Sequence, residues 1–196
     1  MKLLMHICCA NCSLFPLQSF FFRNIDVVGF WYNPNIHPYT EYVKRRDALR
    51  QLQRLWAIDV EYLDHYGLKE FLRAVVHRED ERCAICYAMR LDSTAETAKR
   101  MGFDGFTTTL LVSPYQKFDA LVRIGTEIGE QYGIPFIADD FRPGWKEGMN
   151  RSRELGLYRQ AYCGCIYSEM ERYRSRGKTS AEAQRQSGDK RGTHRA

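Results

Sequence analysis

Short apolar segments alternate with amphipathic ones along most of the chain, and this alternation limits the fold more than any other feature. The segments typical of strands are 2–7, 25–32, 58–63, 103–111 and 134–137. The segments typical of helices are 14–23, 39–56, 68–77, 86–101, 118–132, 145–155 and 166–173. Strands that alternate with helices form parallel sheets. We therefore predict one Rossmann-like α/β domain over residues 1–175, with a parallel sheet flanked by helices.

The end of the chain differs from this domain in composition. From Arg172 onward there are eight Lys or Arg and two Asp or Glu, a net charge of +6, while the whole chain carries +5. The residues before Arg172 therefore carry a net charge of −1. Few apolar residues occur after residue 175, so we expect 176–196 to be a mobile basic tail. Two interpretations stay open: a solubilising tail, or an arm that contacts nucleic-acid phosphates.

Seven cysteines occur in three tight groups, and no cysteine lies elsewhere. The groups are Cys8 with Cys9 and Cys12, Cys83 with Cys86, and Cys163 with Cys165. We find no apolar run of 18 residues, and His6 interrupts the apolar N-terminal segment, so we expect neither a membrane span nor a signal peptide. A cytoplasmic location follows as an expectation. In that reducing compartment, paired cysteines indicate metal binding or catalysis rather than structural disulfides.

Several polar residues follow the ends of predicted strands. Cys8 and Cys9 come directly after the first strand. Open parallel sheets bind ligands outside the carboxyl ends of their strands, so the loops at that edge are candidates for the substrate site. The predicted substrate-binding residues from these loops are Asn33, Asn35, His37, Thr108 and Ser113.

The cysteine spacing alone leaves three kinds of chemistry open. Four thiolates from two pairs suit an iron–sulfur cluster, a CxxC with another pair suits structural zinc, and a dithiol relay needs no metal. Adjacent cysteines such as Cys8 and Cys9 are poor zinc ligands, since zinc knuckles separate their ligands by two to four residues. A disulfide between Cys163 and Cys165 would close a small strained ring that is easily reduced. Both observations favour redox chemistry, although Cys163 and Cys165 as further metal ligands remain the alternative.

The chain resembles the QueH-type epoxyqueuosine reductases. Five segments that run in order along residues 1–175 carry this resemblance: His6-Ile7-Cys8-Cys9-Ala10; Tyr32-Asn33-Pro34-Asn35-Ile36-His37-Pro38 with Glu41-Tyr42 and Arg45-Arg46; Arg82-Cys83-Ala84-Ile85-Cys86-Tyr87 with Arg90-Leu91; Thr107-Thr108-Thr109-Leu110-Leu111-Val112-Ser113-Pro114-Tyr115; and Ser152 to Cys165 with Leu157-Tyr158-Arg159-Gln160 and Tyr162-Cys163-Gly164-Cys165. The resemblance implies a HUP-type α/β fold, a [4Fe–4S] cluster, and two-electron reduction of the epoxide of epoxyqueuosine in tRNA, whose oxygen leaves as water.

The resemblance also assigns roles to the cysteines. Cys8, Cys9, Cys83 and Cys86 take the role of cluster ligands, while Cys163 and Cys165 take that of the redox-active pair. Asn11 departs from the family, which often has proline at this position. For Cys12 two roles stay open, a ligand to a second iron near the cluster or a spare thiol.

Other functions compete with this reading. No Gly-rich dinucleotide fingerprint follows the first strand, so we expect no tightly bound flavin or nicotinamide and an external electron donor instead. A zinc-stabilised nucleic-acid-binding module is one alternative, supported by the basic tail. A HUP-type enzyme that activates nucleotides to modify tRNA is another, although no pyrophosphate-binding loop follows the first strand.

Overall fold

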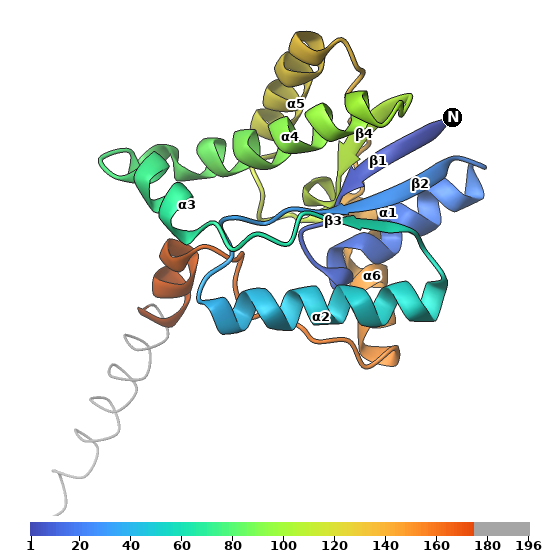
Figure 1. The fold of residues 1–196 in the computed structure, drawn as a ribbon. Coiled ribbons are helices and arrows are strands. Elements are labelled where there is room, and N and C mark those ends of the chain that lie inside the picture. The colour runs from blue at the N-terminus through green and yellow to red at the C-terminus, as the bar shows by residue number, and fades with distance from the viewer. Residues whose placement is uncertain (175–196) are drawn as a thin grey trace, which may run out of the picture.

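A four-stranded parallel sheet forms the centre of the computed structural model, which describes residues 1–174. The strands are β1 (Lys2–His6), β2 (Asp26–Trp31), β3 (Val60–Tyr62) and β4 (Gly105–Thr108), in the order β3-β2-β1-β4. Every pairing is parallel. This topology confirms the predicted α/β fold (Figure 1). The predicted tail, 176–196, lies outside the described residues.

Helices cover both faces of the sheet (Figure 1). On one face α4 (Arg82–Arg100) contacts β1, β4 and α5 (Phe118–Tyr132). On the other face α1 (Ala10–Phe22) contacts β2, α2 (Tyr39–Trp56) and α6 (Trp145–Glu154). The short α3 (Leu68–Val75) contacts α4, and residues 166–174 form a last helical segment. None of the helices that the structure describes is both long and apolar enough to cross a membrane.

The central strand β1 is buried on both of its faces. Leu3, Leu4 and Met5 are all completely inaccessible to solvent. The sequence of a strand that is covered by helices on both faces is a continuous apolar run, because neither face contacts water. The apolar segment at the start of the chain is therefore the centre of the core, and the cysteines that follow it emerge at the edge of the sheet.

Two strand segments are much shorter in the structure than the sequence predicts. The strand expected over 103–111 stops at Thr108, because the Thr108 hydroxyl accepts a hydrogen bond from the Leu110 amide (3.1 Å) and a 3₁₀ turn (Thr109–Val112) begins. The strand expected over 134–137 is reduced to a single bridge between Phe106 and Phe136. Pro135 has no amide hydrogen to extend the pairing.

The first helix begins earlier than predicted. The sequence suggested a helix from Leu14 with Ser13 as its N-cap, whereas α1 starts at Ala10 and Cys9 is the N-cap. Ser13 lies inside the helix, where its hydroxyl donates to the Ala10 carbonyl at 2.7 Å. The correction places the first cysteine group at the helix start.

Candidate redox site at the carboxyl edge of the sheet

The first cysteine group lies where the strand order reverses. The chain leaves β1 through α1 toward β2 on one side, while β4 pairs with β1 on the other. Such a switch point leaves a crevice at the carboxyl ends of the two strands. Cys8 is anchored there to the end of β4: its amide donates to the Thr109 hydroxyl (3.0 Å), which in turn donates to the Cys8 sulfur (3.3 Å).

Cys8, Cys9 and Cys12 form a compact group of buried thiols. Their three sulfur atoms lie within 4.8 Å of one another, and those of Cys8 and Cys9 are 3.8 Å apart. The early start of α1 explains this geometry, since Cys9 caps the helix and Cys12 lies in its first turn. The free amides and the dipole at a helix N-terminus favour negative charge, which suits thiolates.

The three thiols differ in acidity. Hydrogen bonds from the Cys12 and Cys9 thiols hold the pKa of Cys8 well below its usual range. Burial raises the pKa of Cys9 to about 12, and the hydrogen bond with Cys8 raises the pKa of Cys12. Cys8 is therefore the first of the three to become a thiolate, and the thiols of Cys9 and Cys12 stabilise its negative charge by hydrogen bonds.

A chain of amide hydrogen bonds joins this group to the C-terminal part of the domain. Gln160 donates to the Cys9 sulfur at 2.9 Å, and its carbonyl oxygen accepts from the Asn11 amide at 2.8 Å. The buried Ser152 hydroxyl donates to the Asn11 carbonyl oxygen. Sequence reasoning missed Gln160 and noted Asn11 only as a departure from the family. Gln160 could have been found from its position in the segment just before the third cysteine group, which carries part of the family resemblance.

Cys83 and Cys86 lie in the first turns of α4, which begins at Arg82 and not at Cys86 as the sequence suggested. They are not part of the compact group of three thiols. Burial raises the pKa of Cys86 to about 12, and nearby Cys163 and Cys165 act in the same direction on both thiols of this pair. The structure therefore places the second and third cysteine groups close enough to interact electrostatically.

Arg90 is a buried cation beside these thiols. One turn beyond Cys86 on α4, it is 1% exposed, and its charge lowers the pKa of both Cys8 and Cys86. The guanidinium donates to the Asn35 side-chain oxygen, but its Nε has no hydrogen-bond partner. Within residues 1–174 it forms no ion pair with a carboxylate. A buried charge without a counter-charge costs several kcal/mol, so this arrangement suits an anionic group among the thiols.

The Cys163-Gly164-Cys165 turn is held through its backbone. Arg45 donates to the carbonyls of Cys163 (2.7 Å) and Tyr162 (2.9 Å), and the His37 amide donates to the Gly164 carbonyl (2.8 Å). Gly164 has φ +146°, a conformation that side chains rarely adopt, and a Cβ there would lie 3.2 Å from Arg45. The turn is therefore rigid while the Cys163 thiol is exposed.

One cavity of about 900 Å³ brings two of the cysteine groups together. Cys8 and Cys12 of the first group and Cys163 of the third all line it. Gln116, also in the lining, donates to the Cys163 sulfur at 3.2 Å. Polar, aromatic and basic residues form much of the remaining lining, among them Asn11, Arg45, Ser113, Tyr115, Trp145, Lys146, Arg153, Arg159, Gln160 and Tyr162. Arg45 and Arg90 belong to the segments that carry the family resemblance, but they were not among the predicted site residues.

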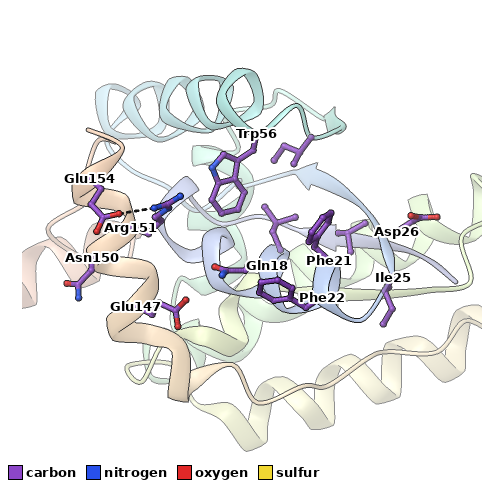
Figure 2. A pocket seen from close by; sticks show the side chains of 13 residues that line it. Gln18, Phe21, Phe22, Ile25, Asp26, Trp56, Glu147, Asn150, Arg151 and Glu154 are labelled. Atoms are coloured by element: carbon purple, nitrogen blue, oxygen red, sulfur yellow. Dashed lines mark hydrogen bonds and ion pairs between the residues drawn. The ribbon is translucent and has the colours of Figure 1, made fainter.

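A second cavity of about 1010 Å³ lies at the far end of α1 and contains no cysteine (Figure 2). Phe21, Phe22 and Trp56 form its apolar part, with acidic side chains from α6 beside them. Asn150 of α6 lines both cavities, so this helix is the wall between them. Since all seven cysteines lie away from it, we place the redox chemistry in the first cavity.

Most residues predicted to bind substrate do not line this cavity. Asn33 donates to the Ile7 carbonyl at 2.9 Å, Asn35 accepts from Arg90, and the Thr108 hydroxyl bonds to the His6 ring at 2.9 Å. His37 packs its ring against Tyr66 and Phe71. All four are buried. Of the predicted set, Ser113 is the residue that lines the cavity.

The sequence is similar to one family over most of its length. A family model described as epoxyqueuosine reductase QueH matches residues 3–171. The chain is 36% identical over 172 residues to the epoxyqueuosine reductase QueH of Dehalococcoides mccartyi, covering 88% of this chain and 94% of that protein. It is 38% identical over 178 residues to that of Thermotoga maritima, covering 86% and 91%.

A solved structure shares the fold. It is the U34-tRNA thiolase NcsA from Methanococcus maripaludis with its [4Fe-4S] cluster, at a TM-score of 0.55 and 14% identity. The match covers 86% of this chain and 61% of the thiolase chain, less than two thirds of that protein's length. At this identity the likeness concerns the fold alone.

Proposed function

The chain belongs to the family of epoxyqueuosine reductases QueH, and on this basis we propose that it is an oxidoreductase that reduces epoxyqueuosine in tRNA to queuosine. The observation that carries the proposal is the shared cavity: Cys8 and Cys12 of the first cysteine group and Cys163 of the third open into the same space. The cavity is large enough for a nucleoside, since small-molecule sites occupy about 300–1,000 Å³.

We propose that an iron–sulfur cluster is held at this site. The donor set fits, because cysteine thiolates are the ligands of such clusters. The buried Arg90 guanidinium, whose Nε has no hydrogen-bond partner, supplies the counter-charge that a thiolate-bound cluster needs. Cys8, Cys9, Cys83 and Cys86 are the proposed ligands, as the family resemblance implies. When bound, such a cluster transfers single electrons.

The position of Cys12 supports a further role at the same centre. Its sulfur belongs to the compact group with Cys8 and Cys9, and it lines the cavity. The proximity of this buried thiol to two proposed ligands favours the role of a ligand over that of a spare thiol. We therefore propose that Cys12 is a ligand at this centre, either to the cluster or to a second iron.

Cys163 and Cys165 are proposed to supply the electron pair for the substrate. Opening an epoxide to an alkene and water consumes two electrons and two protons, and oxidation of two thiols to a disulfide releases the same number of each. The balance closes with one C=C bond and one S–S bond formed and the two C–O bonds of the epoxide broken. An external donor then reduces the disulfide, as expected for a strained and reducible bond.

Neighbouring side chains prepare Cys163 for this step. The amide of Gln116 donates to its sulfur, and Arg45 fixes its carbonyl. Ser168 donates its backbone amide to the Cys165 sulfur at 3.4 Å. Free thiols at such a pair require a reducing compartment, so we propose that the enzyme works in the cytoplasm.

The residues predicted to bind substrate are assigned roles that match their positions. Ser113 is proposed to contact the nucleoside directly. Asn33, Asn35, His37 and Thr108 are proposed to act indirectly, by holding Ile7, Arg90 and the Gly164 turn in place.

Turnover of a defined substrate tests the proposal. Anaerobically purified protein is incubated with epoxyqueuosine-containing tRNA and a chemical reductant, and the nucleosides are analysed by mass spectrometry. We expect loss of one oxygen atom from the modified nucleoside, with iron and sulfide present in the protein. The variant Cys163→Ser should lose turnover and keep its iron. The control Met170→Ala changes an exposed residue that follows the same turn and does not line the cavity, and it should retain turnover. Colourless protein that contains zinc and leaves the nucleoside unchanged would instead support a nucleic-acid-binding module.

A further inference from the structure

An aromatic pair stands at the mouth of the redox cavity. Tyr115 is 83% exposed, although it is a large ring, and it meets Trp145 edge-on at 6.1 Å between ring centroids. Both side chains line the cavity that contains Cys8 and Cys163. An aromatic ring this exposed beside a polar cavity is available for stacking, and unpaired bases of RNA stack on such rings.

Basic side chains surround the same opening. Lys146, Arg153 and Arg159 line the cavity and are exposed. In the part of the chain that the structure describes, none of the three forms an ion pair, and Arg153 bonds only to the neutral Asn150. Glu171 is the acidic side chain in the lining, and it is paired with Arg82. The mouth therefore carries an unneutralised positive charge, although the body of the protein is close to neutral.

Helix α6 separates two surfaces of opposite charge. Lys146 and Arg153 line the redox cavity, whereas Glu147 and Glu154 line the second cavity (Figure 2). The one arginine that α6 contributes to the second cavity, Arg151, is paired with Glu154 at 3.0 Å. The positive charge is thus confined to the side of α6 that faces the thiols.

We infer that the mouth of the redox cavity binds a single-stranded RNA loop, with Tyr115 and Trp145 stacking on a base next to the modified nucleoside and with Lys146, Arg153 and Arg159 contacting phosphates. The inference rests on the proposed function, because it takes the nucleoside in the cavity to be part of an RNA. It locates the binding surface on α6 and on the loop that joins the 3₁₀ turn Thr109–Val112 to α5, which contains Ser113 of the predicted set. The loop after β2, which the sequence also suggested, is not part of this surface.

Binding to an unmodified RNA stem-loop tests the inference without any turnover. Fluorescence anisotropy with the holoenzyme under anaerobic conditions gives the dissociation constant at several salt concentrations. A fully paired RNA duplex of equal charge serves as the reference ligand. We expect the stem-loop to bind more tightly than the duplex, because stacking needs unpaired bases.

Tyr115→Ala should weaken stem-loop binding by roughly 5- to 150-fold, the effect of one base–aromatic stack, while Tyr115→Phe should bind like the wild type. The matched control is Phe22→Ala, an aromatic that is 71% exposed in the second cavity, which should leave binding unchanged. Equal effects of Tyr115→Ala and Phe22→Ala, or no effect of either, would overturn the assignment.

Arg153→Gln and Arg151→Gln make the same change in charge on two sides of one helix. Each lost phosphate contact lowers the slope of log affinity against log salt by about 0.7 for a single strand. We expect this decrease for Arg153→Gln and a decrease of about 2 when Lys146 and Arg159 are also replaced by Gln. Arg151→Gln should leave the slope unchanged, and an equal decrease in this control would refute the location.

The outcomes also separate this inference from the proposed function. If the protein binds RNA at this face but does not reduce epoxyqueuosine, the inferred binding surface stands and the proposed reductase activity is wrong. If the Tyr115 and Arg153 variants reduce epoxyqueuosine normally and bind RNA with unchanged affinity, the proposed reductase activity stands and the inferred binding surface is wrong.

Discussion

Replacing Arg45 by methionine should lower the free energy of unfolding by about 4–6 kcal/mol. The guanidinium is 1% exposed and pairs with the buried Glu41 at 2.7 Å, and removing one partner of a buried ion pair costs about 3–5 kcal/mol. Two further hydrogen bonds, to the carbonyls of Tyr162 and Cys163, are lost as well. These carbonyls are close enough to the surface to bind water instead, so we assign them about 1 kcal/mol together.

The neighbouring arginine provides the control. Arg46→Met removes the same charge from the next position of α2, but Arg46 pairs with the partly exposed Asp64 at 2.9 Å. Such a surface pair contributes about 0–1 kcal/mol. Urea unfolding should therefore separate the two variants clearly, and the melting temperature of Arg45→Met should fall by about 10 °C.

A double variant tests the physical reason. If the unpaired Glu41 carboxylate is the main cost, then Arg45→Met combined with Glu41→Gln should be more stable than the sum of the two single effects predicts, by about 1–3 kcal/mol. Alkylation of Cys163 should also become faster in Arg45→Met, because the turn loses its anchor. A loss of stability below about 1 kcal/mol, with unchanged alkylation, would refute the reasoning.

Three further predictions address the centre, the pH dependence and the tail. Cys83→Ser should abolish the cluster absorption and the bound iron of anaerobic protein. If Cys83→Ser keeps both and Cys12→Ser loses them, the ligands are the compact group of Cys8, Cys9 and Cys12 and do not include Cys83. Burial lowers the pKa of His37 from 6.5 to about 4, so the neutral ring stabilises the fold fully above pH 6.5, and about 1.4 kcal/mol is lost per pH unit as the pH falls toward 4. The urea midpoint should thus fall between pH 7 and pH 5 by less in His37→Phe than in the wild type, and equal decreases would contradict this assignment. Truncation after Gly177 removes five Lys or Arg and two Asp or Glu, a net charge of +3, and should raise the KM for tRNA without changing kcat. The slope of log affinity against log salt should fall by the equivalent of at most about three phosphate contacts. If the truncated protein binds tRNA at low salt as tightly as the full chain, the removed residues have a solubilising role.

The strands and the longer helices were predictable because they depend on local patterns. Residues 39–56 and 118–132 were placed without error, since apolar residues at helical spacing mark one buried face. The start of α1 was missed because Cys9 caps the helix with its backbone conformation and no side-chain hydrogen bond, which leaves no cap residue in the sequence.

Polar residues of the site were harder to interpret. Asn33 and Thr108 follow strands, as binding residues do, yet both are buried and form hydrogen bonds within the protein, to Ile7, His6 and Leu110. The side-chain oxygen of Asn33 has no partner. Arg45 looks like any surface arginine of α2, and its burial depends on a turn more than a hundred residues away. Composition and spacing cannot reveal such partners, because the pairing exists only once the sheet has brought distant segments together.

The anchoring of Cys8 and Cys9 has a consequence for how the protein matures. Thr109, which holds Cys8, lies 101 residues further along the chain, and Gln160, which holds Cys9, lies 151 residues beyond it. Chains are synthesised from the N-terminus, so the first three thiols leave the ribosome long before the groups that enclose them exist. The parallel pairing of β1 with β4 is itself a long-range and slow event. The thiols of a growing chain thus remain open to metals and oxidants until nearly the whole domain has been made.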